Sequence, residues 1–129
     1  MARASVLRSD WDFDVARGPD WLLVQPRRLG TRSPGAPSFA EHVWALLEQH
    51  FTHRLVLEMG DFEQLDSDLI SELLRLYKRI YTHDGVMRLC GVSETGEDEL
   101  RACRLEGHFP RYRNRDDAVM GHPHPRHPR

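Results

Sequence analysis

The chain has 129 residues, of which 40% are hydrophobic and 29% are charged, and its formal net charge is −2. These values are typical of one soluble globular domain, and the slightly acidic balance argues against a dedicated nucleic-acid-binding protein. No apolar run approaches the roughly 18 residues of a membrane span, and the first residues lack the apolar core of an export signal, so we expect a cytoplasmic protein. The two cysteines, Cys90 and Cys103, are too few for a disulfide scaffold and are expected to be reduced.

The two ends of the chain differ in composition from its middle. Residues 122–129 read HPHPRHPR, which contains helix-blocking prolines and no large apolar side chain, so a disordered tail is expected. Residues 1–8 are expected to be a flexible N-terminus. One domain therefore occupies residues 9–121. Because the tail carries two arginines and no acidic residue, the net charge without it is −4.

Two strands and a helix are predicted in the first part of the domain. Apolar and acidic residues alternate over residues 11–15, and a second apolar run follows at 21–25. The short Gly-Pro turn between them predicts an antiparallel hairpin. A helix is predicted to begin at Ser38, because Glu41 follows at the spacing of a capping box. Its apolar stripe consists of Phe39, Val43, Leu46, Leu47 and Phe51.

The middle of the chain predicts a strand, a helix and a second strand. Residues 54–59 and 86–92 are almost continuously apolar, as expected for parallel strands that are covered on both faces. The helix between them is expected to be capped by Asp66 or Ser67 and to end where Gly85 adopts a left-handed conformation. Its broad apolar face consists of Leu69, Ile70, Leu73, Leu74, Leu76, Tyr77, Ile80 and Tyr81.

The last part of the domain predicts a third helix, from Ser93 or Thr95 to about residue 105. A short edge strand at 109–113 and one or two helical turns at 115–120 follow. This order of elements indicates an α/β fold. We expect a mixed, mostly parallel sheet with an N-terminal antiparallel hairpin and about four helices packed mainly on one side.

No catalytic, cofactor-binding or metal site is predicted. The sequence contains no P-loop, no G-x-G-x-x-G, no C-x-x-C and no G-x-S-x-G. The histidines of residues 122–129 are interpreted as part of a solvated tail rather than as metal ligands.

The segment 58–71 is the strongest candidate for a functional site. It joins a buried strand to the start of the long helix, where free backbone N–H groups and the positive end of the helix dipole face outward. On residue types alone, the simpler interpretation is a capped helix with a solvated loop. The segment carries the acidic residues Glu58, Asp61, Glu63, Asp66 and Asp68.

Several segments together resemble the STAS domain, the family of anti-sigma factor antagonists and sulfate-transporter C-terminal domains. The resemblance covers residues 11–121 and is densest at residues 54–105. The matching segments are LVLEM at 55–59, FEQLDS at 62–67, LLRLYKR at 73–79, HDGVMRLCGVS at 83–93 and the helix and following segment at 100–109.

The resemblance implies a non-catalytic module that regulates bacterial transcription by partner switching. In that family, a serine in a D-S-S-G motif is phosphorylated by an anti-sigma kinase. Asp66 and Ser67 match the first two positions, whereas Asp68 occupies the usual phosphoacceptor position and Leu69 the glycine position. Asp68 is either a weak, permanent mimic of phosphoserine or the mark of a lost switch. Ser67 and Ser71 remain candidate phosphoacceptors, and all five residues are expected to form the partner-binding edge.

The resemblance also names a class of partner. We expect the partner to be an anti-sigma factor or a related kinase-like regulatory protein. No nucleic-acid or membrane partner is expected, and a homodimer is a further alternative. One alternative is a STAS-like scaffold or oligomerisation subunit of a signalling complex without a phosphorylation switch. Another is a small enzyme or ligand-binding domain that merely shares this topology.

Overall fold

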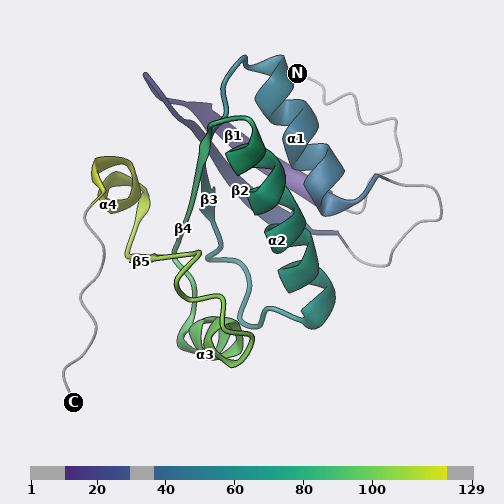
Figure 1. Ribbon diagram of the computed structural model, residues 1–129, viewed down its shortest axis with the longest axis vertical. Helices are drawn as coiled ribbons and strands as arrows, with labels where there is room; N and C mark the ends of the chain where they lie inside the picture. Colours follow the sequence, from purple (N-terminus) through teal and green to yellow (C-terminus); the bar gives the residue numbers. More distant parts are fainter. Residues whose placement is uncertain (1–10, 30–36, 122–129) are drawn as a thin grey trace.

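The computed structural model describes residues 11–29 and 37–121 of the chain (Figure 1). The predicted flexible N-terminus at 1–8 and the predicted tail at 122–129 lie outside the described residues, and so do residues 9–10 and 30–36.

Five strands form one mixed sheet in the order β1-β2-β3-β4-β5. The pair β1 and β2 is antiparallel, and every later pair is parallel. The predicted fold class is therefore confirmed. The elements are β1 (Trp11–Arg17), β2 (Leu22–Arg28), α1 (Phe39–Gln49), β3 (Arg54–Glu58), α2 (Ser67–Thr82), β4 (Val86–Cys90), α3 (Glu94–Ala102), β5 (Arg111–Tyr112) and α4 (Arg115–Met120).

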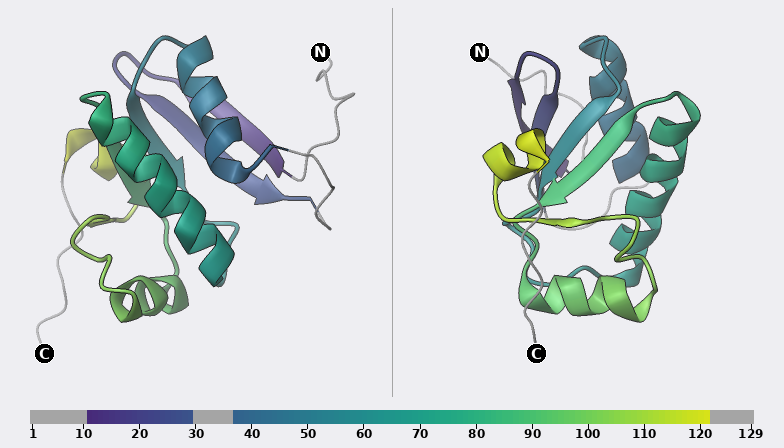
Figure 2. Two further views of the ribbon diagram at one scale, coloured as in Figure 1. Left: turned by 45° about the vertical axis from the view of Figure 1, so that its right-hand side comes forward. Right: turned by 60° about the vertical axis from the view of Figure 1, so that its left-hand side comes forward.

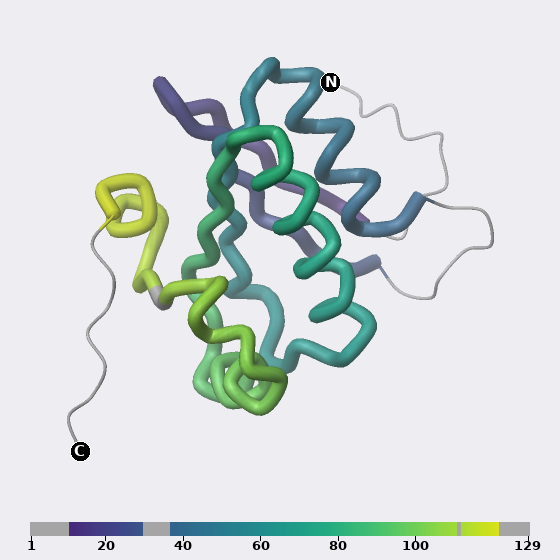
Figure 3. Tube along the Cα trace, viewed as in Figure 1, coloured from purple at the N-terminus to yellow at the C-terminus, as the bar shows by residue number. Residues whose placement is uncertain are grey.

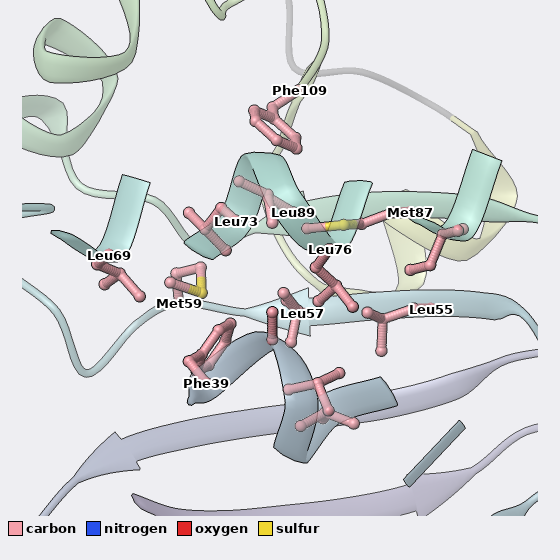
Figure 4. Packing of buried hydrophobic residues seen from close by; sticks show 14 of the residues in the cluster. Phe39, Leu55, Leu57, Met59, Leu69, Leu73, Leu76, Met87, Leu89 and Phe109 are labelled. Carbon is pink, nitrogen blue, oxygen red and sulfur yellow. The ribbon is translucent and has the colours of Figure 1, made fainter. Parts of the chain in front are cut away.

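The helices occupy three positions around the sheet. The long helices α1 and α2 cover one face, the short helix α4 covers part of the opposite face, and α3 lies near the carboxyl ends of the parallel strands (Figure 2). Because helices cover both faces of the sheet, successive side chains of strand β3 pack alternately on one face and on the other. Leu55 and Leu57 belong to the main core under α1 and α2 (Figure 4). Val56 instead packs with Trp21 and Ala118 in a smaller cluster on the other face.

Helix α1 begins as the sequence predicts. The Glu41 backbone N–H donates to Ser38 Oγ at 3.2 Å, and the Ser38 N–H donates to Glu41 Oε1 at 3.2 Å, so the capping box is complete. The inner face of α1 then packs on the sheet through Val43, Trp44 and Leu47. This cap starts α1 in the correct register for its apolar stripe to face the core.

The end of α2 differs from the prediction in its backbone. The left-handed residue is Asp84, with φ of 61°, and Gly85 is not in that conformation. Asp tolerates the left-handed region because its short polar side chain bonds locally. Gly85 is instead required by a close approach, since a Cβ there would overlap the His53 carbonyl oxygen and lie 2.8 Å from Ile80 Cγ2.

Phe51 was expected in the apolar stripe of α1, and that expectation is wrong. The helix ends at Gln49, and Phe51 follows it with φ of 54° and a side chain that is 91% exposed. Its N–H donates to the Glu48 carbonyl at 3.2 Å, and the Thr52 N–H donates to the Leu47 carbonyl at 3.2 Å. Phe51 thus occupies the left-handed position after the helix, which glycine usually fills.

We expect Phe51→Gly to stabilise the protein by about 1 kcal/mol, because it removes the cost of holding a bulky residue in the left-handed region. Urea unfolding followed by circular dichroism measures the change. Phe51→Ala is the control. Alanine also removes the exposed ring, but it keeps the energetic cost of a residue with a Cβ in the left-handed conformation. Equal stabilities of the two variants would contradict this explanation.

Candidate partner-binding site

The loop from β3 to α2 lies at the carboxyl edge of the sheet, beside α3 (Figure 3). Two hydrogen bonds connect this loop to α3. The Leu65 N–H donates to Glu99 Oε1 at 2.6 Å, and Ser93 Oγ donates to the Glu63 carbonyl at 2.7 Å. Because the same Ser93 oxygen accepts the Gly96 N–H and caps α3, the helix and the loop are held in one arrangement.

The other side of the site is held by the end of β2. Arg28 Nη1 lies 3.1 Å from Asp66 Oδ2, and its guanidinium lies over the ring of Trp11, 5.0 Å from the centroid. The Trp11 ring in turn contacts Phe62 of the loop, with 6.0 Å between centroids. The β3–α2 loop is therefore positioned by two segments that are distant from it in sequence.

Asp66, rather than Ser67, caps α2. Its Oδ1 accepts the Leu69 N–H at 2.8 Å, while its Oδ2 is the atom that Arg28 approaches. Ser67 is the first residue of the helix, and Asp68 follows it within the first turn. An acidic residue in this turn is favourable because it faces the positive end of the helix dipole.

The structure separates the five predicted site residues into two groups. Asp66, Ser67, Asp68 and Ser71 are exposed, and we refer to these four as the α2 edge. Leu69 is 2% exposed and belongs to the main core, so its side chain supports the edge from inside.

The acidic residues of segment 58–71 also differ in their exposure to solvent. Asp61 and Glu63 are exposed in the same loop, but Glu58 is half-buried, with its Oε1 2.6 Å from Arg115 Nε of α4. Arg115 therefore engages Glu58 from the side of the sheet that α4 covers. The contributions of Arg28 and Glu99 are not apparent from the sequence, because no local spacing relates these residues to the loop.

The two cysteines are both free, and they differ in environment. Burial, followed by the nearby Glu58 carboxylate, raises the pKa of Cys90 to about 12, so this residue stays a thiol at neutral pH. Cys103 is exposed at the end of α3. Within residues 11–29 and 37–121, no group of three or more His, Cys, Asp or Glu side chains could hold a metal ion. No helix in this part of the chain is long and apolar enough to cross a membrane.

The fold and the loop define a class of protein: a small open-sheet α/β domain with an exposed, pre-positioned helix start. The model of the STAS domain family matches residues 34–118. The chain therefore belongs to the STAS domain family. No curated protein matches it in sequence.

Solved structures show the same fold at low sequence identity. TM1081 of Thermotoga maritima, in its NMR structure, is 18% identical with a TM-score of 0.72, and the alignment covers 93% of this chain and 96% of that chain. An anti-sigma factor antagonist from Mycobacterium paratuberculosis is 18% identical with a TM-score of 0.68, covering 86% and 92%. An anti-sigma-factor antagonist (STAS) domain protein from Planctomyces limnophilus is 18% identical with a TM-score of 0.59, covering 85% and 97%.

Proposed function

We propose that this chain is a non-catalytic, anti-sigma factor antagonist-like module that binds an anti-sigma factor or a related kinase-like regulator in a cytoplasmic partner-switching pathway. The α2 edge is the surface that the partner contacts. Membership of the STAS family and the anti-sigma factor antagonists among the solved structures support this proposal.

One observation carries the proposal. The α2 edge is exposed, yet the loop before it is held by Arg28 on one side and by Glu99 on the other. A binding surface of this kind is prepared before the partner arrives, because few groups must be ordered on association. A merely solvated loop would not require hydrogen bonds to two distant elements.

Asp68 takes the phosphoacceptor position in this proposal. It carries one negative charge at the start of α2, where phosphoserine would carry about 1.5–2 charges and three acceptor oxygens. Asp68 is thus a weaker and permanent version of the phosphorylated state. Replacing it with serine removes that charge and converts the edge to the unphosphorylated form, which is the partner-binding form in the family.

The test is isothermal titration calorimetry of the full chain with the purified anti-sigma kinases of the organism that encodes it. We expect Asp68→Ser to bind one of them at least tenfold more tightly than the wild type does. Ser71→Arg in the Asp68→Ser background should weaken that complex, because it places a long cation on the contact surface. Glu48→Arg, an exposed change at the far end of α1, is the matched control.

Three outcomes would contradict parts of this proposal. Unchanged affinity after both Asp68→Arg and Ser71→Arg, for a demonstrated partner, would show that the α2 edge is not the interface. Equal affinity of the wild type and Asp68→Ser would refute the proposal that Asp68 mimics phosphoserine, and it would favour the alternative that the switch has been lost. Phosphate found on Ser67 or Ser71 by mass spectrometry, after incubation with the kinase and ATP, would show instead that a phosphorylation switch is retained.

A further inference from the structure

The short helix α4 is attached to the sheet by a small apolar contact. Ala118 is buried in the smaller cluster and Val119 packs partly against that cluster, but Met120 is 66% exposed. The long helix α2, in contrast, buries five side chains in the main core. A helix of six residues is too short to be stable alone, so the position of α4 depends on its contacts with the sheet.

Two arginines hold the two ends of α4. Near the end of the helix, Arg88 Nη1 of β4 donates to the Ala118 carbonyl at 2.7 Å. At the start of the helix, Arg115 Nε donates to Glu58 Oε1 at 2.6 Å, and these two side chains are 35% and 31% exposed. Because water reaches both charged groups, release of this pair exchanges its hydrogen bonds for bonds to water at a small cost. These contacts therefore fix the place of α4 without making its release costly.

The surface beneath α4 is apolar and contains a thiol. Val56 and Cys90 are fully buried in the same cluster as Ala118. Burial, followed by the nearby Glu58 carboxylate, raises the pKa of Cys90 to about 12, whereas Arg115 acts in the opposite direction. Since the thiolate is the reactive form of cysteine, Cys90 is inert to alkylation at about pH 8 as long as α4 is in place.

The residues that α4 covers are also those from which the β3–α2 loop departs. Glu58 is the last residue of β3, and it lies beside Cys90 of β4 in the sheet. The Met59 N–H donates to the Cys90 carbonyl at 2.9 Å, and the Phe62 N–H donates to the Met59 carbonyl at 3.1 Å. The contact between Arg115 and Glu58 thus joins α4 to the strand end that leads directly into the loop.

We propose that α4 is a strap, which opens and closes as a unit while the rest of the fold stays intact. The closed strap covers Cys90 and holds the Glu58 side chain, which fixes the point where the β3–α2 loop begins. Opening breaks the contacts of Arg88 and Arg115, exposes the surface beneath and loosens the loop. Resting on the proposed function, the open strap lowers the affinity of the α2 edge for its partner, so α4 regulates that site.

Alkylation of Cys90 by iodoacetamide at about pH 8 measures strap opening in the full chain. The background is Cys103→Ser, because Cys103 is exposed and would react as well. We expect labelling without denaturant, at a rate that urea changes little below the unfolding midpoint, since opening of α4 exposes little surface. Labelling through global unfolding would instead rise steeply with urea.

Two substitutions should weaken the strap independently. Arg115→Gln removes the pair with Glu58, and Asn114→Ala removes the side chain that caps α4 by accepting the Asp117 N–H at 2.9 Å. Each should speed the labelling of Cys90 about threefold or more.

Arg75→Gln is the matched control, since it breaks an exposed pair with Glu72 on α2, across the sheet from α4. It should leave the rate of Cys90 labelling unchanged. Amide hydrogen exchange, followed by NMR, tests the link to the loop. Arg115→Gln should speed exchange of the hydrogen-bonded Phe62 and Leu65 amides about threefold or more, and Arg75→Gln should not.

Three results would overturn the inference. The first is labelling of Cys90 that follows global unfolding at every urea concentration. The second is slower labelling of Arg115→Gln, because the reagent would then reach Cys90 with α4 closed, where Arg115 lowers the pKa of the thiol. The third is unchanged exchange at Phe62 and Leu65, which would refute the link to the loop.

These measurements use the free chain, so their failure is distinct from that of the proposed function. The regulatory consequence is tested by calorimetry with the anti-sigma kinases. Arg115→Gln in the Asp68→Ser background should weaken the complex about threefold or more, and equal affinity would refute the regulation. A strap that opens in a chain that binds no kinase would refute only the proposed function.

Discussion

Gly85→Ala is expected to destabilise the protein by about 3 kcal/mol or more, because the position has no room for a side chain. The added Cβ would overlap the His53 carbonyl oxygen and lie 2.6 Å from His53 Cβ. That carbonyl accepts the Val86 N–H at 2.9 Å, at the point where β4 begins beside β3. Relief of the overlap must therefore separate two central strands. Urea unfolding, followed by circular dichroism, gives the change in the free energy of unfolding.

Gly107→Ala is the matched control. A Cβ at Gly107 would meet no atom within 4 Å, and the residue is not in a left-handed conformation. Its substitution should change stability by no more than about 0.5 kcal/mol. A loss for Gly85→Ala no larger than that for Gly107→Ala would show that the close approach to His53 does not determine stability at this position.

Leu69→Ala is expected to cost about 3 kcal/mol, as for other fully buried leucines. The side chain is 2% exposed and lies in the main core, directly beneath the α2 edge (Figure 4). The substitution leaves a cavity under the first turn of α2, where neighbouring side chains close it only in part. The same chemical denaturation measures the loss, and thermal unfolding should show a lower Tm.

Leu29→Ala makes the same chemical change at an exposed position, since Leu29 is 54% exposed at the end of β2. We expect it to change stability by about 0.5 kcal/mol or less. A small effect of Leu69→Ala, comparable with that of Leu29→Ala, would mean that Leu69 does not support the edge from inside. In that case its place in the core would need revision.

Local patterns account for most of the fold. The capping box at Ser38, the apolar strands at the centre of the sheet and the caps of α2 and α3 each depend on residues within a few positions of one another. Such features are readable from one sequence because the physical interaction is itself local. The mostly parallel order of strands then follows from the alternation of helices and buried strands.

Features that depend on contacts between residues distant in the sequence could not be predicted from local patterns. The sequence predicts a left-handed conformation for Gly85, because glycine usually fills that position after a helix. In the structure, Gly85 is required instead by the close approach of His53, 32 positions earlier. Likewise, the partners of the loop are 38 and 34 positions away in sequence. Arg28 and Glu99 are ordinary charged residues in the sequence, and only the folded arrangement brings them to the site.

The bonds from Arg28 and Glu99 have a kinetic consequence. In the proposed complex, a loop that is already ordered in the free protein would bind without first searching for its bound shape, so we expect association close to rigid-body docking. Differences in affinity among variants of the edge then arise chiefly from how fast complexes dissociate. Loosening either bond would instead slow the encounter, even though neither side chain need touch the partner.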